Sequence, residues 1–332
     1  MIWTFQESNF GPYKKAGGVF YLQFCFTKNK KMESGKTYII TGPTSGIGYE
    51  TALELSRYGM VILVGRNRDK LEKVQKTLMQ RGHHAVSVVC DLSDISSVKH
   101  AAKEIVALNL PVTGLLNNAG IMPSKATKSK QGFDMTYATN HLGAFALTEA
   151  LEPHLPDGAN VVFIASAIED PERKPAKIMG MKGGRYISAE ASARGEWKEG
   201  GSKMPGIDAY ATSKQCILAS ALAFARENPR LHFNAVEPGI TRGTGLGGES
   251  TNAFVRFLFG HLMAIIPPFS NYSSTPGKSA KVIAKILTAA SGQSGVYFDE
   301  KGRPMRGSEL ANDPAFQDRV VAETRQLLEK II

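Results

Sequence analysis

The chain has 332 residues, of which 42% are hydrophobic and 21% charged, so it can bury a large core as one large domain or two modest ones. Nothing in this composition indicates disorder. The formal net charge is +10, but no run of five or six like charges and no basic stripe interleaved with aromatic residues occurs, which argues against nucleic-acid binding. We interpret the charge as a general attraction for anions, including a phosphorylated cofactor.

The first 31 residues differ from the rest of the chain. They contain five lysines against one acid, Glu7, and an apolar run over residues 16–26 that is too short to span a bilayer. No small-residue cleavage site follows that run. We expect residues 1–31 to be a dispensable extension, or Met32 to be the true start, and residues 32–332 to form a single domain.

The three cysteines, Cys25, Cys90 and Cys216, are odd in number and far apart. Their spacing fits neither a disulfide framework nor a metal site, so no metal is expected. Free thiols are typical of a reducing compartment, which predicts a cytoplasmic protein.

A strand, a glycine turn and a helix follow one another near residue 40. Residues 36–41 are rich in β-formers, and residues 49–57 have apolar side chains at helical spacing. Such a turn lets the backbone approach a pyrophosphate, and the helix start presents free N–H groups to it. The spacing is G-x-x-x-G-x-G instead of G-x-G-x-x-G, so an ordinary glycine-rich turn is the alternative. The candidate cofactor contacts are Gly42, Thr44, Ser45, Gly46, Ile47 and Gly48.

The apolar run over residues 60–64 is typical of a strand buried on both faces, and Arg66 follows it. An acid at this place would bind the adenosine ribose, whereas an arginine accommodates a 2′-phosphate. Arg66 and the missing acid therefore predict NADP(H) over NAD(H), with a solvated surface arginine as the alternative.

Three further strand–helix units are predicted. Strands over residues 85–89, 113–116 and 161–165 alternate with helices over 71–79, 94–108 and 132–151. At the strand ends lie Asp91 and Leu92, then Asn117, Asn118, Ala119 and Gly120, then Ser166. Asp91 either contacts the adenine or begins a turn, and the asparagines either steady neighbouring strands or contact the cofactor. This alternation predicts an α/β fold, a doubly wound parallel sheet with these motifs at one edge.

Tyr210 and Lys214 lie four residues apart in a predicted helix and so share one face. A nearby ammonium favours the phenolate, so we expect the pKa of Tyr210 to be lowered toward neutrality. The spacing alone is weak evidence, because chance matches are common.

Together these residues resemble the short-chain dehydrogenase/reductase family, from about Lys36 to the C-terminus. Residues 41–48 resemble its glycine motif, residues 117–120 its second signature, and residues 237–241 its proline-glycine stretch. Asn140, Ser166, Tyr210 and Lys214 match its catalytic four. The run Asn140-His141-Leu142-Gly143, the arginine after the second strand and the spacing from Pro238 to Leu246 resemble the retinol-dehydrogenase-like and protochlorophyllide-reductase-like branch.

The sequence departs from the family pattern in three places. Pro43 replaces a small residue in the glycine turn, and 43 residues separate Ser166 from Tyr210 where about a dozen are usual in the family. The second signature lacks the cysteine of protochlorophyllide reductases, which argues against light-driven pigment reduction.

The resemblance implies a Rossmann-type sheet of about seven strands and hydride transfer between NADP(H) and a carbonyl or alcohol. Tyr210 would be the acid or base, Lys214 would lower its pKa and hold the nicotinamide ribose, and Ser166 would bind the substrate oxygen. Asn140 would hold a relay water. The resemblance adds Pro238, Gly239 and Thr241 to the cofactor contacts.

Two segments are expected to shape the substrate site. Residues 167–208 mix eight basic and seven acidic residues without strong periodicity, which predicts a flap or edge lobe. Pocket candidates within it are Ile178, Met179, Met181, Tyr186 and Trp197, and surface packing is the favoured role for each of them. Residues 243–278 read as a lid, in which the apolar stretch 254–269 favours a large apolar substrate. A core or dimer helix is the alternative for that stretch, and membrane-surface contact is less favoured.

The sequence thus predicts an NADP(H)-dependent oxidoreductase acting on an apolar small molecule. A retinol- or steroid-type alcohol dehydrogenase is the alternative within the family, and a non-catalytic dinucleotide-binding sensor is the alternative outside it. A homodimer or homotetramer is usual among such relatives.

Overall fold

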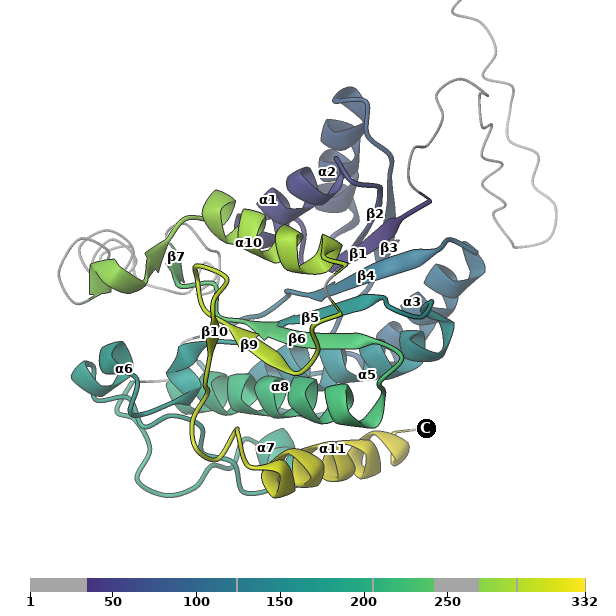
Figure 1. Cartoon of the computed structure of the whole chain (residues 1–332). Helices are drawn as coiled ribbons and strands as arrows, with labels where there is room; N and C mark the ends of the chain where they lie inside the picture. The colour runs from purple at the N-terminus through teal and green to yellow at the C-terminus, as the bar shows by residue number, and fades with distance from the viewer. Residues whose placement is uncertain (1–34, 124, 205, 242–268, 291, 332) are drawn as a thin grey trace, which may run out of the picture. The chain divides into compact units, whose positions relative to one another are not determined.

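The computed structural model describes residues 35–123, 125–204, 206–241, 269–290 and 292–331, all within the compact unit Ser34–Ile332. This unit is built on an eight-stranded sheet of order β10-β9-β6-β5-β4-β1-β2-β3 (Figure 1). The strands are parallel except for the β9–β10 pair. Their bounds are β1 Thr37–Thr41, β2 Met60–Gly65, β3 Ala85–Val89, β4 Val112–Asn117, β5 Asn160–Ile164, β6 His232–Val236, β9 Val296–Phe298 and β10 Pro304–Met305. The expected α/β sheet is confirmed, with the two-residue β10 added to the seven strands foreseen.

Helices cover both faces of the sheet (Figure 1). On one face lie α1 Gly46–Leu55, α2 Arg68–Gln80 and α10 Pro276–Thr288; on the other lie α3 Ile95–Ala107, α5 Gly143–Leu151 and α8 Ile207–Glu227. The C-terminal helix α11, Pro314–Glu329, packs on α8 and also contacts α7, Ala189–Arg194. Shorter helical turns are η2 Glu152–His154, η3 Ala167–Glu169, α6 Lys174–Ile178 and η6 Phe269–Tyr272, and β7 Ile240–Thr241 pairs with β8 Ser273–Ser274 apart from the main sheet.

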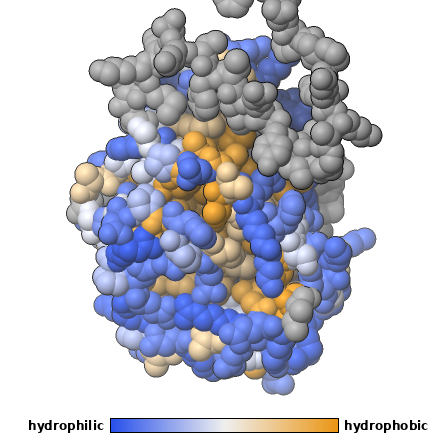
Figure 2. Space-filling view, turned by 90° about the vertical axis from the view of Figure 1, so that its right-hand side faces the viewer, coloured by the Kyte–Doolittle hydropathy of each residue, from blue (hydrophilic) through white to orange (hydrophobic). Residues whose placement is uncertain are grey.

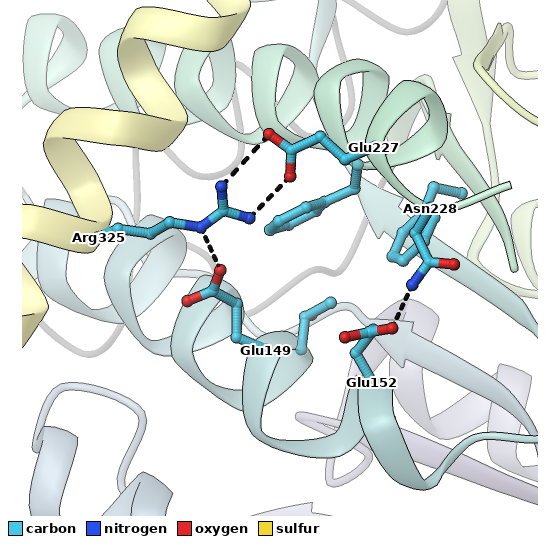
Figure 3. Close-up of a pocket in the computed structure, with 8 residues that line it drawn as sticks. Glu149, Glu152, Glu227, Asn228 and Arg325 are labelled. Carbon is cyan, nitrogen blue, oxygen red and sulfur yellow. Dashed lines mark hydrogen bonds and ion pairs between the residues drawn. The ribbon is translucent and has the colours of Figure 1, made fainter. Parts of the chain in front are cut away.

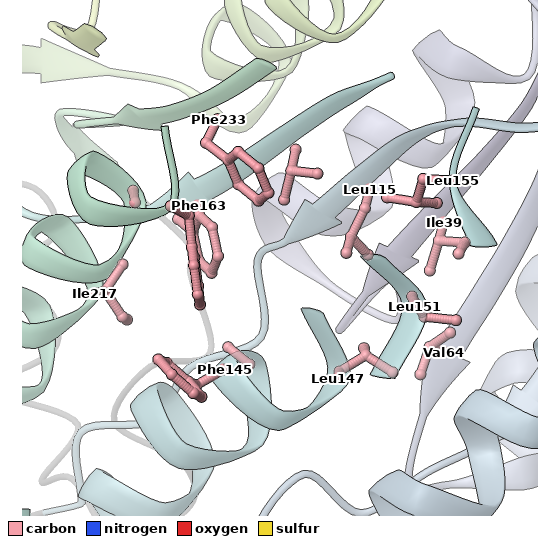
Figure 4. Packing of buried hydrophobic residues seen from close by; sticks show 14 of the residues in the cluster. Ile39, Val64, Leu115, Phe145, Leu147, Leu151, Leu155, Phe163, Ile217 and Phe233 are labelled. Carbon is pink, nitrogen blue, oxygen red and sulfur yellow. The ribbon is translucent and has the colours of Figure 1, made fainter. Parts of the chain in front are cut away.

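The strands are buried on both sides because successive side chains enter opposite layers. Ile39 of β1 and Leu115 of β4 join Phe163 in the cluster under α3, α5 and α8 (Figure 4), whereas Tyr38 and Ile40 face α1 and α10. This accounts for the continuous apolar runs in the sequence. The order of the strands reverses between β1 and β4, and in such sheets ligands bind beyond the carboxyl ends at this point.

The long helix predicted over residues 132–151 begins three residues later and is not uniform. Gly132 has a φ of +78°, and the Asp134 carboxylate accepts a hydrogen bond from Tyr137 N at 2.9 Å, which sets the helix start. The chain then runs through α4 Met135–Tyr137 and a π-helical turn, η1 Ala138–Leu142, into α5. Such π turns cluster at functional sites, and this one contains Asn140.

The insertion before Tyr210 is anchored in its second half. Tyr186 is buried, its hydroxyl donates to Glu323 Oε2 at 2.7 Å, and its ring meets Phe316 edge-on at 5.5 Å. Trp197 lies edge-on to Tyr137, with ring centroids 6.4 Å apart. Of the two roles predicted for Tyr186 and Trp197, packing is therefore the one observed, against α11 and α4 respectively.

Two predicted segments lie wholly or mainly outside the described residues. These are the extension over residues 1–31 and the lid, of which only residues 269–278 are described. Among the helices that the structure describes, none has the length and apolar character to cross a membrane.

We predict that Gly143→Ala destabilises the fold. A Cβ placed on Gly143 would lie 2.1 Å from Leu92 O, so α5 must move away from the loop after β3. We expect a loss of about 2 to 3 kcal/mol in the free energy of unfolding, measured by urea titration. Gly277→Ala in α10 is the control, because its Cβ would meet only Glu50 Oε2 at 4.0 Å. Equal stability of the two variants would contradict this packing.

Candidate active site

Four predicted side chains converge beyond the carboxyl ends of β4 and β5. Ser166 lies two residues after the end of β5, Tyr210 and Lys214 lie in the first half of α8, and Asn140 lies in η1. The turn after β4 passes beside them, since a Cβ placed on Gly120 would lie 3.6 Å from Lys214 Nζ and 3.5 Å from Asn140 Oδ1. Residues distant in sequence are thus gathered in one place, as predicted.

Lys214 is a buried cation. Its side chain is 2% exposed, and Nζ donates to Ile164 O at 2.6 Å and lies 5.5 Å from the centroid of the Tyr210 ring. Burial lowers the pKa of Lys214 to about 8, against an opposing effect of Glu237. Lys214 can therefore gain or lose a proton near neutral pH.

The tyrosine does not have the lowered pKa that the sequence predicts. Burial raises the pKa of Tyr210, the charge of Glu237 raises it further, and a hydrogen bond with Ser166 lowers it. Lys214 lies over the ring and directs its hydrogen bond to Ile164 O, so desolvation of the phenolate dominates. In this arrangement Tyr210 is protonated near neutral pH, as a proton donor must be.

Asn140 joins three segments around Lys214. Its Nδ2 donates to Ile121 O and to Ser213 Oγ, both at 3.0 Å, and its Oδ1 accepts from Ile121 N at 2.8 Å. Both amide hydrogens are therefore used within the protein. The side chain fixes the turn after β4 against α8, and its role in holding a relay water stays a prediction.

The glycine turn has the geometry expected of a phosphate-binding loop. Gly42 and Gly46 have φ values of +67° and +56°, and the exposed Ser45 precedes α1 without capping it through its side chain. The first turn of α1 contains no acid, so its N–H groups and partial positive charge are not neutralised locally. A Cβ on Gly48 would lie 2.2 Å from Gly42 O, which only glycine avoids.

The second asparagine of the 117–120 run supports this turn. Asn118 Nδ2 donates to Thr41 O at 2.8 Å and to Gly42 O at 3.2 Å. The backbone N–H groups of Asn118 and Ala119 both donate to Thr41 Oγ1. Of the two roles left open for Asn118, the structural one is therefore observed, because its amide crosslinks the ends of β1 and β4.

The other predicted cofactor residues differ in their exposure and in their hydrogen bonds. Arg66 is exposed beyond β2 and forms no ion pair with the described residues. Asp91 Oδ1 accepts from Ser93 N and Oγ, so Asp91 begins a turn, and Leu92 is buried. The remaining members are Thr44, Ile47, Gly120, Pro238, Gly239 and Thr241, which line the same sheet edge, with Ile47 buried. Their cofactor contacts stay predictions.

Glu237 is a further buried acid of the site, and its sequence motif predicts no catalytic or cofactor role for it. This glutamate directly follows β6, is 8% exposed, and accepts hydrogen bonds from Ala167 N and from Gly239 N, the latter at 2.9 Å. Burial raises its pKa. An acid immediately after an apolar strand, at the same end of the sheet as Ser166, was the signal available in the sequence.

Two hollows elsewhere in the structure are not this site. One, of about 170 Å³, lies among α5, α8 and α11, where Arg325 pairs with Glu149 at 2.6 Å and Glu227 at 2.7 Å and thereby fastens α11 (Figure 3). The other, of about 130 Å³, is lined mostly by apolar residues such as Leu110 and Leu155, near the amino end of β4. Figure 2 views the side on which the strands begin, where apolar side chains gather, opposite the carboxyl edge.

The sequence and the fold are both similar to those of known short-chain dehydrogenases. Residues 36–174 match the sequence model for short chain dehydrogenases, which ends within the insertion and before Tyr210. The chain is 28% identical to human retinol dehydrogenase 13 over 305 residues, covering 89% of this chain and 85% of the relative. An uncharacterized protein from Mycobacterium paratuberculosis superposes with a TM-score of 0.64 at 26% identity, covering 88% of this chain and 93% of that one. A short chain dehydrogenase from Burkholderia cenocepacia in complex with NADP shares the fold, with a TM-score of 0.59 at 19% identity, over 82% of this chain and 99% of that one.

We predict a specific pH dependence of stability from the buried Lys214. Its pKa is 10.5 in the unfolded chain and about 8 when folded, so between these values the unfolded state binds more protons and stability rises with pH. Lys214→Met lacks this titration. The unfolding free energy of the wild type, minus that of Lys214→Met, should rise by about 3 kcal/mol between about pH 7 and about pH 10.5.

Urea titrations at both pH values measure this difference. Lys73→Met, at an exposed lysine of α2, controls for removal of a surface charge. The same difference at both pH values would mean that folding does not desolvate the Lys214 ammonium.

Proposed function

Because the chain belongs to the short-chain dehydrogenase/reductase family, we propose that it is an NADP(H)-dependent oxidoreductase that interconverts a carbonyl and an alcohol on an apolar small molecule. One observation carries this proposal. Ser166 lies beside Tyr210, where it lowers the pKa of the tyrosine, and Lys214 lies over the tyrosine ring, at the carboxyl edge of the sheet beside the reversal of strand order. A proton donor, its neighbouring hydroxyl and a titratable cation are the groups that carbonyl reduction requires.

The residues at the glycine turn fit a phosphorylated dinucleotide. The uncapped start of α1 would receive the pyrophosphate, and Gly42 and Gly46 already adopt the positive φ values that such a loop needs. Arg66 would pair with the ribose 2′-phosphate, for which it is exposed and without an ion pair in the described chain. NADPH, when bound, supplies the hydride, while the protein supplies orientation and protons.

The protein side chains would divide the proton chemistry among them. The raised pKa keeps Tyr210 protonated, so its hydroxyl can donate to the developing alkoxide of a bound carbonyl compound. The Ser166 hydroxyl, which lies beside Tyr210, would donate to the same oxygen and stabilise its negative charge. Lys214, with a pKa of about 8, would then return a proton to Tyr210. We infer reduction as the favoured direction.

The substrate class is proposed from the relatives. Human retinol dehydrogenase 13 is similar over most of the chain, which supports a lipophilic aldehyde, ketone or alcohol as substrate. A retinol- or steroid-type alcohol dehydrogenase is therefore the second candidate. The free, buried thiols of Cys90 and Cys216 suit a reducing compartment, for which we propose the cytoplasm.

We predict that Tyr210→Phe abolishes turnover while leaving NADPH binding intact. The purified protein is assayed for NADPH oxidation against lipophilic aldehydes, ketones and quinones, including retinaldehyde. Loss of the proton donor should reduce kcat by about 100-fold to 10,000-fold. Binding of NADPH, measured by fluorescence titration, should stay within about twofold, because the ring remains.

The outcome separates the enzyme from a sensor. Tight NADPH binding with no turnover of any compound by the wild type would favour the non-catalytic alternative. Turnover by Tyr210→Phe equal to the wild type would contradict the assignment of the acid.

We predict that Arg66→Ala weakens NADPH binding by about 10-fold to 100-fold, the loss expected for a charge-assisted hydrogen bond to phosphate. NADH lacks the 2′-phosphate, so its dissociation constant should change by less than about twofold. Arg81→Ala, at an exposed arginine of the opposite end of α2, is the matched control. An equal effect of Arg66→Ala on both dinucleotides would refute the 2′-phosphate assignment.

A further inference from the structure

Glu237 is a buried carboxylate placed between two loops of the candidate site. Its Oε2 accepts from Ala167 N, next to Ser166, and its Oε1 accepts from Gly239 N at 2.9 Å. These N–H groups belong to the loop after β5 and to the turn after β6. One side chain therefore binds together the segment that carries the serine and the segment that carries Pro238 and Gly239.

The sheet brings these loops side by side but does not fix their conformation. Ile164 pairs with Val236 in the last register position, and Ala165 N donates to Val236 O at 3.0 Å. Beyond this bond the backbone N–H of Ala167 depends on the Glu237 carboxylate. Without the carboxylate this partly buried donor would lose its partner, and the Ser166 loop would lose a fixed point.

The charge of Glu237 acts on the tyrosine and the lysine. It opposes the burial effect on the pKa of Lys214 and reinforces the burial effect on the pKa of Tyr210. A buried carboxylate is costly to fold and is retained where it is compensated or used. The titratable groups that face Glu237 in the described residues are Tyr210 and Lys214 of α8, Tyr297 of β9, Glu300 after β9, Arg173 before α6 and Glu169 of η3.

We propose that Glu237 is a positioning residue for Ser166, Tyr210 and Lys214: its carboxylate holds the Ser166 loop against the Pro238–Gly239 turn and places a negative charge behind the tyrosine and lysine. The inference rests on the function proposed above and deepens it. It assigns separate effects to the two parts of the side chain. The hydrogen bonds set geometry, and the charge sets the protonation of its neighbours.

Three variants separate these effects. Glu237→Gln keeps the shape but removes the charge and one acceptor. Glu237→Asp keeps the charge but is too short to reach both N–H groups. Glu169→Gln is the matched control, because Glu169 is also buried and belongs to the same loop, but its carboxylate accepts from Ser308 N and Oγ instead of from Ala167 N.

The kinetic test uses the pH dependence of NADPH-dependent carbonyl reduction. Removing the negative charge lowers the pKa of both Tyr210 and Lys214, so Glu237→Gln should lose activity at high pH about one unit earlier than the wild type. Its kcat should fall by about 10-fold to 100-fold as Ser166 is misplaced. Glu237→Asp should also have the lower kcat, but it should lose activity at the same high pH as the wild type. Glu169→Gln should likewise lose activity at the same high pH as the wild type.

A second measurement does not depend on turnover. The lysine Cε resonances are titrated by NMR, with Lys214→Met to assign the Lys214 signal. The pKa of Lys214 should fall by about one unit in Glu237→Gln and stay unchanged in Glu169→Gln. If the wild type turns over no substrate, the proposed function fails, but this titration still decides whether Glu237 acts on Lys214. An unchanged Lys214 titration in Glu237→Gln would overturn the proposal.

Discussion

A buried ammonium is the constraint on which the candidate site depends. Lys214 is almost fully enclosed, and an uncompensated charge there would cost several kcal/mol. Ile164 O accepts its hydrogen bond at 2.6 Å, and Glu237 supplies the opposing charge. Both partners come from the carboxyl ends of neighbouring parallel strands. The two partners of the cation are therefore placed by the register of β5 and β6. The contacts that stabilise this edge of the sheet also position Lys214.

The same edge explains why a long insertion is tolerated. Ser166 is held by the end of β5, and Tyr210 and Lys214 are held by α8, which packs directly on the sheet. The chain between them can lengthen without moving either, because neither depends on the connection for its position. Its second half attaches to α11 through Tyr186 and to α8 through Arg185 N, which donates to Thr212 Oγ1 at 2.8 Å. The insertion is thus free to shape the surroundings of the site without carrying its central residues.

The spacing of apolar residues predicted the strands, and the position of the motifs at strand ends predicted that the candidate catalytic side chains would lie close together. The strand over residues 85–89 has the predicted bounds, and Ser166 follows β5 as expected. Individual hydrogen bonds of the site could not be predicted from the spacing of residues. The amide of Asn118 binds the glycine turn, Asp134 delays a helix start, and Glu237 bridges two loops. Each depends on which backbone groups lie within reach after folding, and sequence spacing does not encode that distance.

The pKa of Tyr210 is another property that sequence spacing did not predict, and it bears on the direction of the proposed reaction. The four-residue spacing predicts that Lys214 stabilises a Tyr210 phenolate and lowers its pKa. In the folded protein, desolvation raises the pKa of Tyr210 instead and lowers that of Lys214 to about 8. Burial thus pushes the two values apart. With its pKa raised, Tyr210 is protonated near neutral pH, so little phenolate is present to act as a base in oxidation. A phenolate formed by proton donation would be readily reprotonated, and Lys214, with a pKa of about 8, can supply the proton. The pair would therefore act as an acid with its own proton supply, which suits reduction better than oxidation.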